Sequence, residues 1–121
     1  MPESIKISVF GIVGSPLCVA SSDGQEIYNR LNAALEANRE VALSFHNVTA
    51  LTSAFLNAAI GQLYGTFSEE KITSLLMMEN MEQEDRDLLE RVVDNAKLYF
   101  ENPPRFNQAI REILEEEEDE L

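Results

Sequence analysis

The chain has 121 residues, of which 45% are hydrophobic and 26% charged, and its formal net charge is −13 from 22 acidic and 9 basic residues. This length and composition predict one globular domain with a single core and argue against wholesale disorder. The negative charge disfavours nucleic acid and anionic membranes as partners, because both attract positively charged surfaces.

The first half of the chain predicts two strands with a helix between them. Residues 5–9 alternate apolar and polar positions, which is typical of a strand with one covered face, and a loop with a short extended piece at 17–19 follows. A capping-box pattern at Ser22 predicts a helix that ends near Asn38. Residues 40–45, EVALSF, are almost continuously apolar and predict a central strand that is buried on both faces.

The second half predicts a further strand between two helices. The stretch VTALTSAFLNAAIGQLYG indicates a helix over about residues 53–65, and KITSLLMME indicates a buried strand centred on residues 75–77. A cap-like pair at residues 80 and 83 precedes a long helix, whose apolar side chains keep a period of about 3.6 over residues 88–100. The prolines at 103–104 end it.

A last helix is predicted up to residue 114, before the acidic run EEEEDEL. The resulting order, β-α-β-α-β-α-α, predicts an α/β fold with a small mixed or parallel sheet packed with helices. We expect residues 1–114 to form a single domain and residues 115–121 to form an acidic, solvated tail that folding does not require. The alternative is that the tail attracts a basic partner.

Cysteine content and hydropathy bear on the compartment. Cys18 is the single cysteine, so no intramolecular disulfide can form, and a reducing compartment is favoured. No apolar stretch approaches the roughly 20 residues needed to cross a bilayer, and MPESIKISVF does not resemble a signal peptide. We therefore expect a cytoplasmic protein.

Few residues have the spacing of a catalytic or metal site. His46, the single histidine, follows the strand at 40–45, so His46 and Ser53 are a candidate nucleophile pair. A solvated or hydrogen-bonded histidine is the commoner explanation, since no nucleophile elbow and no orienting acid accompany it. The acids at 82–87 suit the first turn of a helix, and GIVGS at 11–15 lacks the lysine of a phosphate loop. We expect no enzyme activity, no metal and no cofactor.

The junction before the third predicted helix has more distinctive features. Either Thr52 or Ser53 can supply an N-cap hydroxyl, and the same position favours a phosphate. Small residues such as Ala54 keep this helix slim, so that its backbone can approach a sheet or another protein; plain packing on a sheet explains them equally well. Asn57 and Gly61, one turn apart, leave a face that need not be buried. These five residues are the candidate partner-binding site.

The stretch VALSFHNVTALTSAFLNAAIGQLYG resembles the signature of STAS-like domains of unknown function, which occur in bacterial regulatory proteins. SPLCVASSDGQEIYNRL and ERVVDNAKLYF are similar to the same family, so the resemblance extends from Ile5 to Phe100. That family is similar to anti-sigma factor antagonists, which act by partner switching. An antagonist binds a kinase-type anti-sigma factor through a helix N-terminus and the strand before it, and phosphorylation of a serine at that junction releases the complex.

The resemblance implies roles for individual residues. The antagonist motif is an Asp, two serines and a Gly, and Thr52, Ser53, Ala54 and Phe55 stand at these positions. The second serine is the usual phosphate acceptor, and Ala54 has no hydroxyl there. A shift of the alignment by one residue makes Ser53 the acceptor, and the sequence leaves the choice between Ser53 and Thr52 open.

The resemblance therefore implies a non-enzymatic signalling module in transcription regulation. Its partner would be a regulatory protein such as a histidine-kinase-like ATPase or an anti-sigma factor. The alternative is a small-ligand or nucleotide sensor that uses the helix N-terminus at Thr52 and Ser53. The oligomeric state is not decided, and a homodimer stays open.

Overall fold

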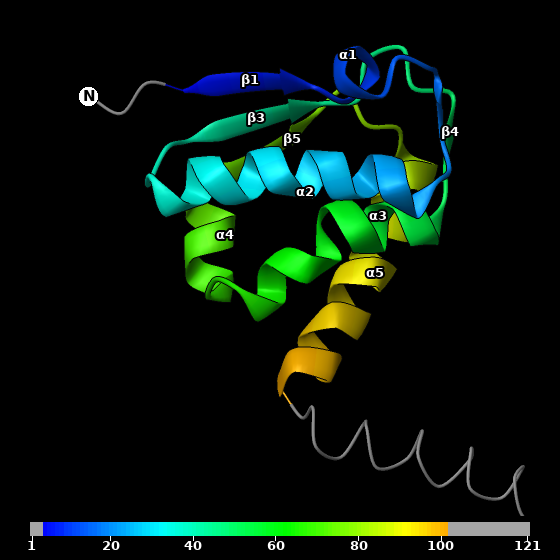
Figure 1. The fold of residues 1–121 in the computed structure, drawn as a ribbon. Coiled ribbons are helices and arrows are strands. Elements are labelled where there is room, and N and C mark those ends of the chain that lie inside the picture. Colours follow the sequence, from blue (N-terminus) through cyan, green and yellow to red (C-terminus); the bar gives the residue numbers. More distant parts are fainter. Residues whose placement is uncertain (1–3, 102–121) are drawn as a thin grey trace, which may run out of the picture.

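Three parallel strands form the main sheet of the structure, a computed structural model that describes residues 4–101 (Figure 1). They lie in the order β1-β3-β5, with bounds β1 Ile5–Ser8, β3 Val41–Ser44 and β5 Leu76–Glu79. Every residue of β3 is buried, and Phe45 just after it is buried as well, so the predicted interior strand is confirmed. This α/β architecture, with a parallel sheet, is the predicted fold class.

A second sheet has two residues in each strand. β2 (Leu17–Cys18) pairs in parallel with β4 (Ala50–Leu51). The extended piece predicted at 17–19 is thereby confirmed. No pattern predicted β4, because a strand of two residues is too short to show a period.

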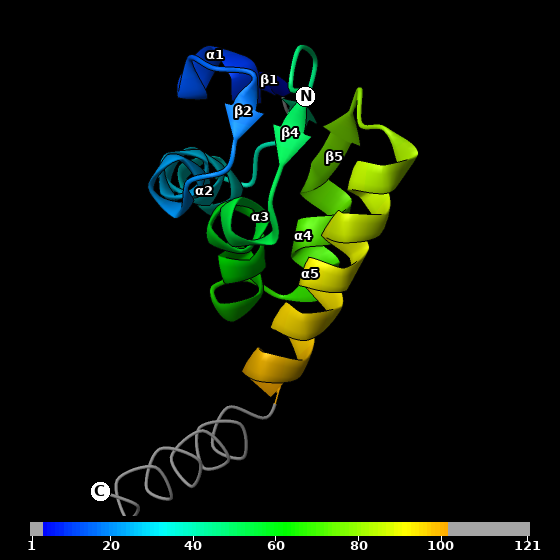
Figure 2. The ribbon, with the colours of Figure 1, turned by 90° about the vertical axis from the view of Figure 1, so that its right-hand side faces the viewer.

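Helices pack on one side of the main sheet. Within residues 4–101 their bounds are α1 Val9–Val13, α2 Ser21–Glu36, α3 Ser53–Ala59, α4 Glu69–Leu75 and α5 Gln83–Glu101, with a 3₁₀-helix η1 at Gly61–Gly65. Helices α2, α3 and α4 lie on the same side of the sheet, and α5 runs beside α3 and η1 (Figures 1 and 2). The predicted last helix and the acidic run at 115–121 lie outside the described residues.

The closest helix packing is between α2 and α3, and Gly24 permits it. A Cβ on Gly24 would lie 2.5 Å from the carbonyl oxygen of Phe55 and 2.9 Å from the Cβ of Ala58. The side chains around this contact are fully buried, and each such side chain contributes about 1.5–3 kcal/mol to folding; they include Ile27, Leu31, Phe55 and Leu56. The small residues of α3 thus serve close approach to α2, a neighbour that the sequence did not indicate.

Two short helices were not predicted, and each begins with a serine cap. The Ser8 Oγ accepts a hydrogen bond from the Gly11 amide at the start of α1, and Gly14 ends this helix at a φ of 76°. In α4 the Ser68 Oγ accepts from the Lys71 amide. The prediction of a buried strand over KITSLLMME is wrong for residues 71–75, which belong to α4; the strand begins only at Leu76, and Met77 on it is exposed. GIVGS is therefore mostly helix α1, and its second glycine is a helix end.

The two predicted capping pairs are wrong in detail. Helix α2 begins at Ser21 after Ala20, without a side-chain cap, so Ser22 is already inside the helix. Asn80 does not cap α5, which begins at Gln83; its backbone has a φ of 57° in the turn after β5. The predicted end of α2 is confirmed, because Asn38 follows it with a φ of 57°.

Candidate functional site

Thr52 is the N-cap residue of α3, and its hydroxyl both accepts and donates a hydrogen bond. Its Oγ1 accepts a hydrogen bond from the Phe55 amide at 3.2 Å and donates one to the Val19 carbonyl at 2.9 Å. The Thr52 amide donates to the Cys18 carbonyl at 3.3 Å. The predicted cap at this junction is thus supplied by Thr52 and not by Ser53. Thr52 joins the start of α3 to the segment between β2 and α2.

The small sheet explains why two helices begin side by side. β2 leads into α2 and β4 leads into α3, so the parallel pairing of β2 with β4 aligns the two helix N-termini (Figure 1). Cys18 of β2 is completely buried at this point. Burial, and secondarily the negative charge of Asp23, raise the pKa of the Cys18 thiol, so it stays neutral and is a poor nucleophile. Its role is packing.

The first turns of α3 expose a different set of residues. Ser53, Ala54 and Asn57 are all exposed. Together with Val92 and Asn95 of α5 they line a shallow cavity of about 360 Å³. The predicted site residues on α3 therefore face outward next to a helix that is distant in the sequence.

A second cavity of about 660 Å³ continues this hollow along α5. It shares Asn57 and Asn95 with the first cavity, and its remaining lining residues are Gln62, Ala96, Tyr99 and Phe100. We call the two cavities together the α3–α5 groove. Among the described residues that line it there is no Asp, Glu, Lys, Arg or His. Its surface combines amides, hydroxyls and aromatic rings, a composition suited to protein contacts.

Gly61 lies beneath this groove. It is buried, and a Cβ there would lie 2.6 Å from the Asn57 Oδ1 and 3.6 Å from the Ala96 Cβ. The prediction that Asn57 and Gly61 share an exposed face is therefore wrong for Gly61. The reason is that α3 ends at Ala59 and the chain continues as η1, which packs against α5.

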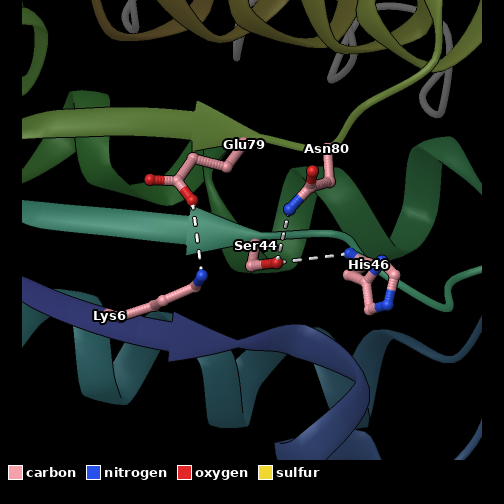
Figure 3. Close-up of polar contacts among 5 residues, drawn as sticks. All are labelled: Lys6, Ser44, His46, Glu79 and Asn80. Atoms are coloured by element: carbon pink, nitrogen blue, oxygen red, sulfur yellow. Dashed lines mark hydrogen bonds and ion pairs between the residues drawn. The ribbon is translucent and has the colours of Figure 1, made fainter.

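Polar residues also gather at the carboxyl ends of β3 and β5 (Figure 3). The Ser44 Oγ accepts hydrogen bonds from the His46 amide at 3.3 Å and from the Asn80 Nδ2 at 3.2 Å. Lys6 and Glu79 form an ion pair across β3, with 3.7 Å between Nζ and Oε2. The hydrogen bonds of Ser44 and Asn80 stabilise the turns that follow these strands. The sequence analysis did not assign this role to either residue; the signal was the asparagine that follows each strand in FHN and MEN.

The candidate nucleophile pair is not formed. The His46 side chain is exposed after β3, and Ser53 is exposed on α3. Within residues 4–101 no hydrogen bond joins the two side chains. The described part of the chain also has no group of three or more His, Cys, Asp or Glu residues placed to hold a metal ion.

Comparison with known protein families matches the family model for a STAS-like domain of unknown function (DUF4325) to residues 23–86. The chain belongs to this family. Searches of curated proteins and of solved structures gave no significant match. The STAS-like resemblance inferred from the sequence is thereby confirmed.

The matched part of this STAS-like domain contains Thr52, Ser53, Ala54 and Asn57. The α5 side of the groove, with Val92 and Asn95, lies beyond it. None of the described helices is both long and apolar enough to span a membrane.

Proposed function

We propose that this STAS-like domain is a non-enzymatic regulatory module that binds another protein through the start of α3 and the adjoining α3–α5 groove. Its mode of action would be partner switching, as in anti-sigma factor antagonists. A histidine-kinase-like ATPase or an anti-sigma factor is the partner class that we expect.

The proposal rests on one observation: at the start of α3 the Thr52 hydroxyl is used in structural hydrogen bonds, whereas the neighbouring Ser53 is exposed. Thr52 makes two hydrogen bonds with its Oγ1, whereas Ser53 and Ala54 on the next positions are exposed. Substitution or phosphorylation of the exposed residues that would contact a partner therefore leaves the helix cap in place. The groove beside them offers uncharged hydrogen-bonding groups, which can be desolvated at smaller cost than charged groups.

The same geometry favours Ser53 over Thr52 as a phosphate acceptor. A phosphate on Thr52 would remove the donor that holds the Val19 carbonyl and would crowd the Phe55 amide. A phosphate on exposed Ser53 would leave these bonds in place and add about −1.5 to −2 charges at the proposed interface. Phosphorylation of Ser53 would then weaken partner binding while the fold is retained.

The alternative, a nucleotide or small-anion sensor at this helix start, has less support. The Phe55 amide is already occupied by Thr52, and none of the described residues of the groove is cationic. A nucleotide phosphate is usually held by lysine, arginine or several free amides. We therefore do not propose a second function for this site.

The test compares Ser53→Asp with Ser68→Asp. Both serines are exposed at helix starts, Ser53 as the first residue of α3 and Ser68 as the N-cap of α4, so both variants gain the same charge at the start of a helix. Negative charge at a helix start is tolerated or mildly stabilising, so both should stay folded. Binding to a purified histidine-kinase-like ATPase or anti-sigma factor from the same genome is measured by calorimetry.

We expect Ser53→Asp to weaken binding at least about tenfold, because an unpaired carboxylate would be desolvated in the interface. Ser68→Asp should bind like the wild-type protein. Equal affinities of the two variants, or wild-type protein that binds none of these partners, would refute the proposal.

A further inference from the structure

The α5 wall of the α3–α5 groove is one stripe of that helix. Its members are spaced at i, i+3, i+4, i+7 and i+8, and they are Val92, Asn95, Ala96, Tyr99 and Phe100. Residues with this spacing lie on one face of a helix and extend over about 12 Å of its length. The stripe reaches the last turn of α5, which ends at Glu101. The groove therefore lies next to the point where the chain continues beyond α5.

The aromatic end of this stripe offers apolar surface. Phe100 keeps 38% of its surface exposed, although its ring lies against Gly65, where a Cβ would be 2.5 Å from the Phe100 Cε1. The rings of Tyr99 and Phe100 meet edge to face, with 4.8 Å between their centroids. Exposed aromatic surface gains free energy when apolar side chains cover it. This end of the groove therefore favours an apolar occupant.

The chain itself has an apolar segment directly after α5. In RFNQAIREIL, residues 105–114, the apolar side chains repeat the spacing i, i+3, i+4, i+7 and i+8; they are Phe106, Ala109, Ile110, Ile113 and Leu114. This spacing predicts a helix with one apolar face, which is also about 12 Å long. An isolated helix of this length is marginal in water, so its apolar face needs a surface that covers it.

The connection to α5 favours the groove as that surface. Only three residues, NPP at 102–104, separate Glu101 from the segment. The prolines cannot continue α5, and Pro104 has the fixed φ that suits the first residue of a new helix. Two helices joined by about two to five residues form an antiparallel pair. Return of the segment along the groove would place Phe106 near Phe100 and Leu114 near Val92.

Charge favours the same occupant. None of the described residues that line the groove is charged, so a charged side chain would be desolvated there without a partner. The apolar face of the segment carries no charge, because Arg105, Arg111 and Glu112 lie at its other positions. A tethered segment also has an effective concentration on the order of millimolar, which a separate molecule would have to match.

We propose that residues 105–114 fold back as a short helix into the α3–α5 groove of the same molecule, with their apolar face on Ala96, Tyr99 and Phe100. The regulatory consequence rests on the proposed function: the segment occupies the surface that the regulatory partner would use, so the partner must displace it. Binding of the partner is then weakened by the chain's own segment.

The test is cross-linking of the full chain with a short bismaleimide reagent. Asn57→Cys, at an exposed position shared by both cavities of the groove, is combined with Ala109→Cys on the apolar face of the segment. Asn95→Cys with Ala109→Cys is a second pair, on the α5 wall. Cys18 is completely buried and does not compete for the reagent.

The matched control pair is Glu70→Cys with Ala109→Cys. Glu70 is exposed on α4 and does not line the groove. Its neighbour Glu69 forms an ion pair with Lys97 of α5, so Glu70 also lies close to the last turns of α5. A segment without a preferred site would reach the control thiol as readily as a thiol in the groove.

We expect both groove pairs to cross-link within one molecule at least about tenfold faster than the control pair. Equal rates would overturn the proposal. A product with the mass of two chains would assign the groove to the segment of a second copy and would overturn the fold-back within one molecule.

Ile110→Glu and Gln108→Glu test the apolar face, since both add the same charge but only the first lies on that face. In the chain with Asn57→Cys and Ala109→Cys, Ile110→Glu should slow cross-linking about tenfold and Gln108→Glu less than about twofold. Equal effects would overturn packing through this face.

Competition with the partner is measured by calorimetry on the same two substitutions in the otherwise wild-type chain. Ile110→Glu should bind the histidine-kinase-like ATPase or anti-sigma factor at least about threefold more tightly than Gln108→Glu, because the segment no longer occupies the groove. Equal affinities would overturn the competition. If neither variant bound these partners, the proposed function and the competition would both be refuted, whereas the cross-links would still decide where the segment lies.

Discussion

The substitution Gly24→Ala tests the packing that positions α3 against α2. Alanine in place of glycine inside a helix normally stabilises by up to about 1 kcal/mol. Here the new Cβ would lie 2.5 Å from the Phe55 carbonyl oxygen, 2.9 Å from the Ala58 Cβ and 3.3 Å from the Ala59 amide nitrogen. Two of these three atoms belong to the backbone of α3, so the contact can be relieved only if the two helices separate.

Overpacking of this kind destabilises by about 1–3 kcal/mol, which exceeds the gain in helix propensity. We expect a net loss of about 1 kcal/mol in the free energy of unfolding, measured by urea denaturation followed by far-ultraviolet circular dichroism. Ser22→Ala, an exposed change in the same turn, is the control for propensity alone and should not destabilise by more than about 0.5 kcal/mol.

A double variant separates the two contacts of the new Cβ. Ala58→Gly removes the Cβ that lies 2.9 Å away, and in the Gly24→Ala background it should recover part of the loss, although the Phe55 carbonyl remains. A Gly24→Ala protein as stable as the wild type or more stable would refute the reasoning. It would mean that α2 and α3 can separate without loss of packing.

Three further predictions follow from single features. Thr52→Val removes the α3 cap and the bond to Val19 and should lower the free energy of unfolding by about 1–2 kcal/mol in urea denaturation, whereas Thr52→Ser should lose less. Cys18 should react with iodoacetamide only on unfolding, and because its pKa is raised in the folded state, stability should fall as pH rises above the ordinary thiol pKa of 9.0. Deletion of residues 115–121 should leave the melting temperature nearly unchanged; a loss of several degrees would show that this segment docks on the domain.

The strongest local patterns predicted the centre of the fold correctly. The nearly continuous apolar run at residues 40–45 predicted a buried strand, and every residue of β3 is buried. Thr52 and Ser53 stand between a strand pattern and a helix pattern, and α3 begins at Ser53 with Thr52 as its N-cap. The STAS-like resemblance rested on the same stretch.

The short elements could not be predicted from the sequence, for a physical reason. Helices α1 and α4 have five and seven residues, and β4 has two, so none repeats its period often enough to be recognised. They are stabilised by single caps at Ser8 and Ser68 and by pairing with β2, which are contacts of individual groups.

By itself the sequence determined the α/β class, the interior strand, the α3 junction and the family, because each depends on order and periodicity along the chain. Only the tertiary structure decided which hydroxyl is engaged, that Gly61 is buried, and that Asn57 lies beside Asn95 of α5. Such groupings join residues that are far apart in the sequence, and they exist only where the packing of helices on the sheet brings these residues together.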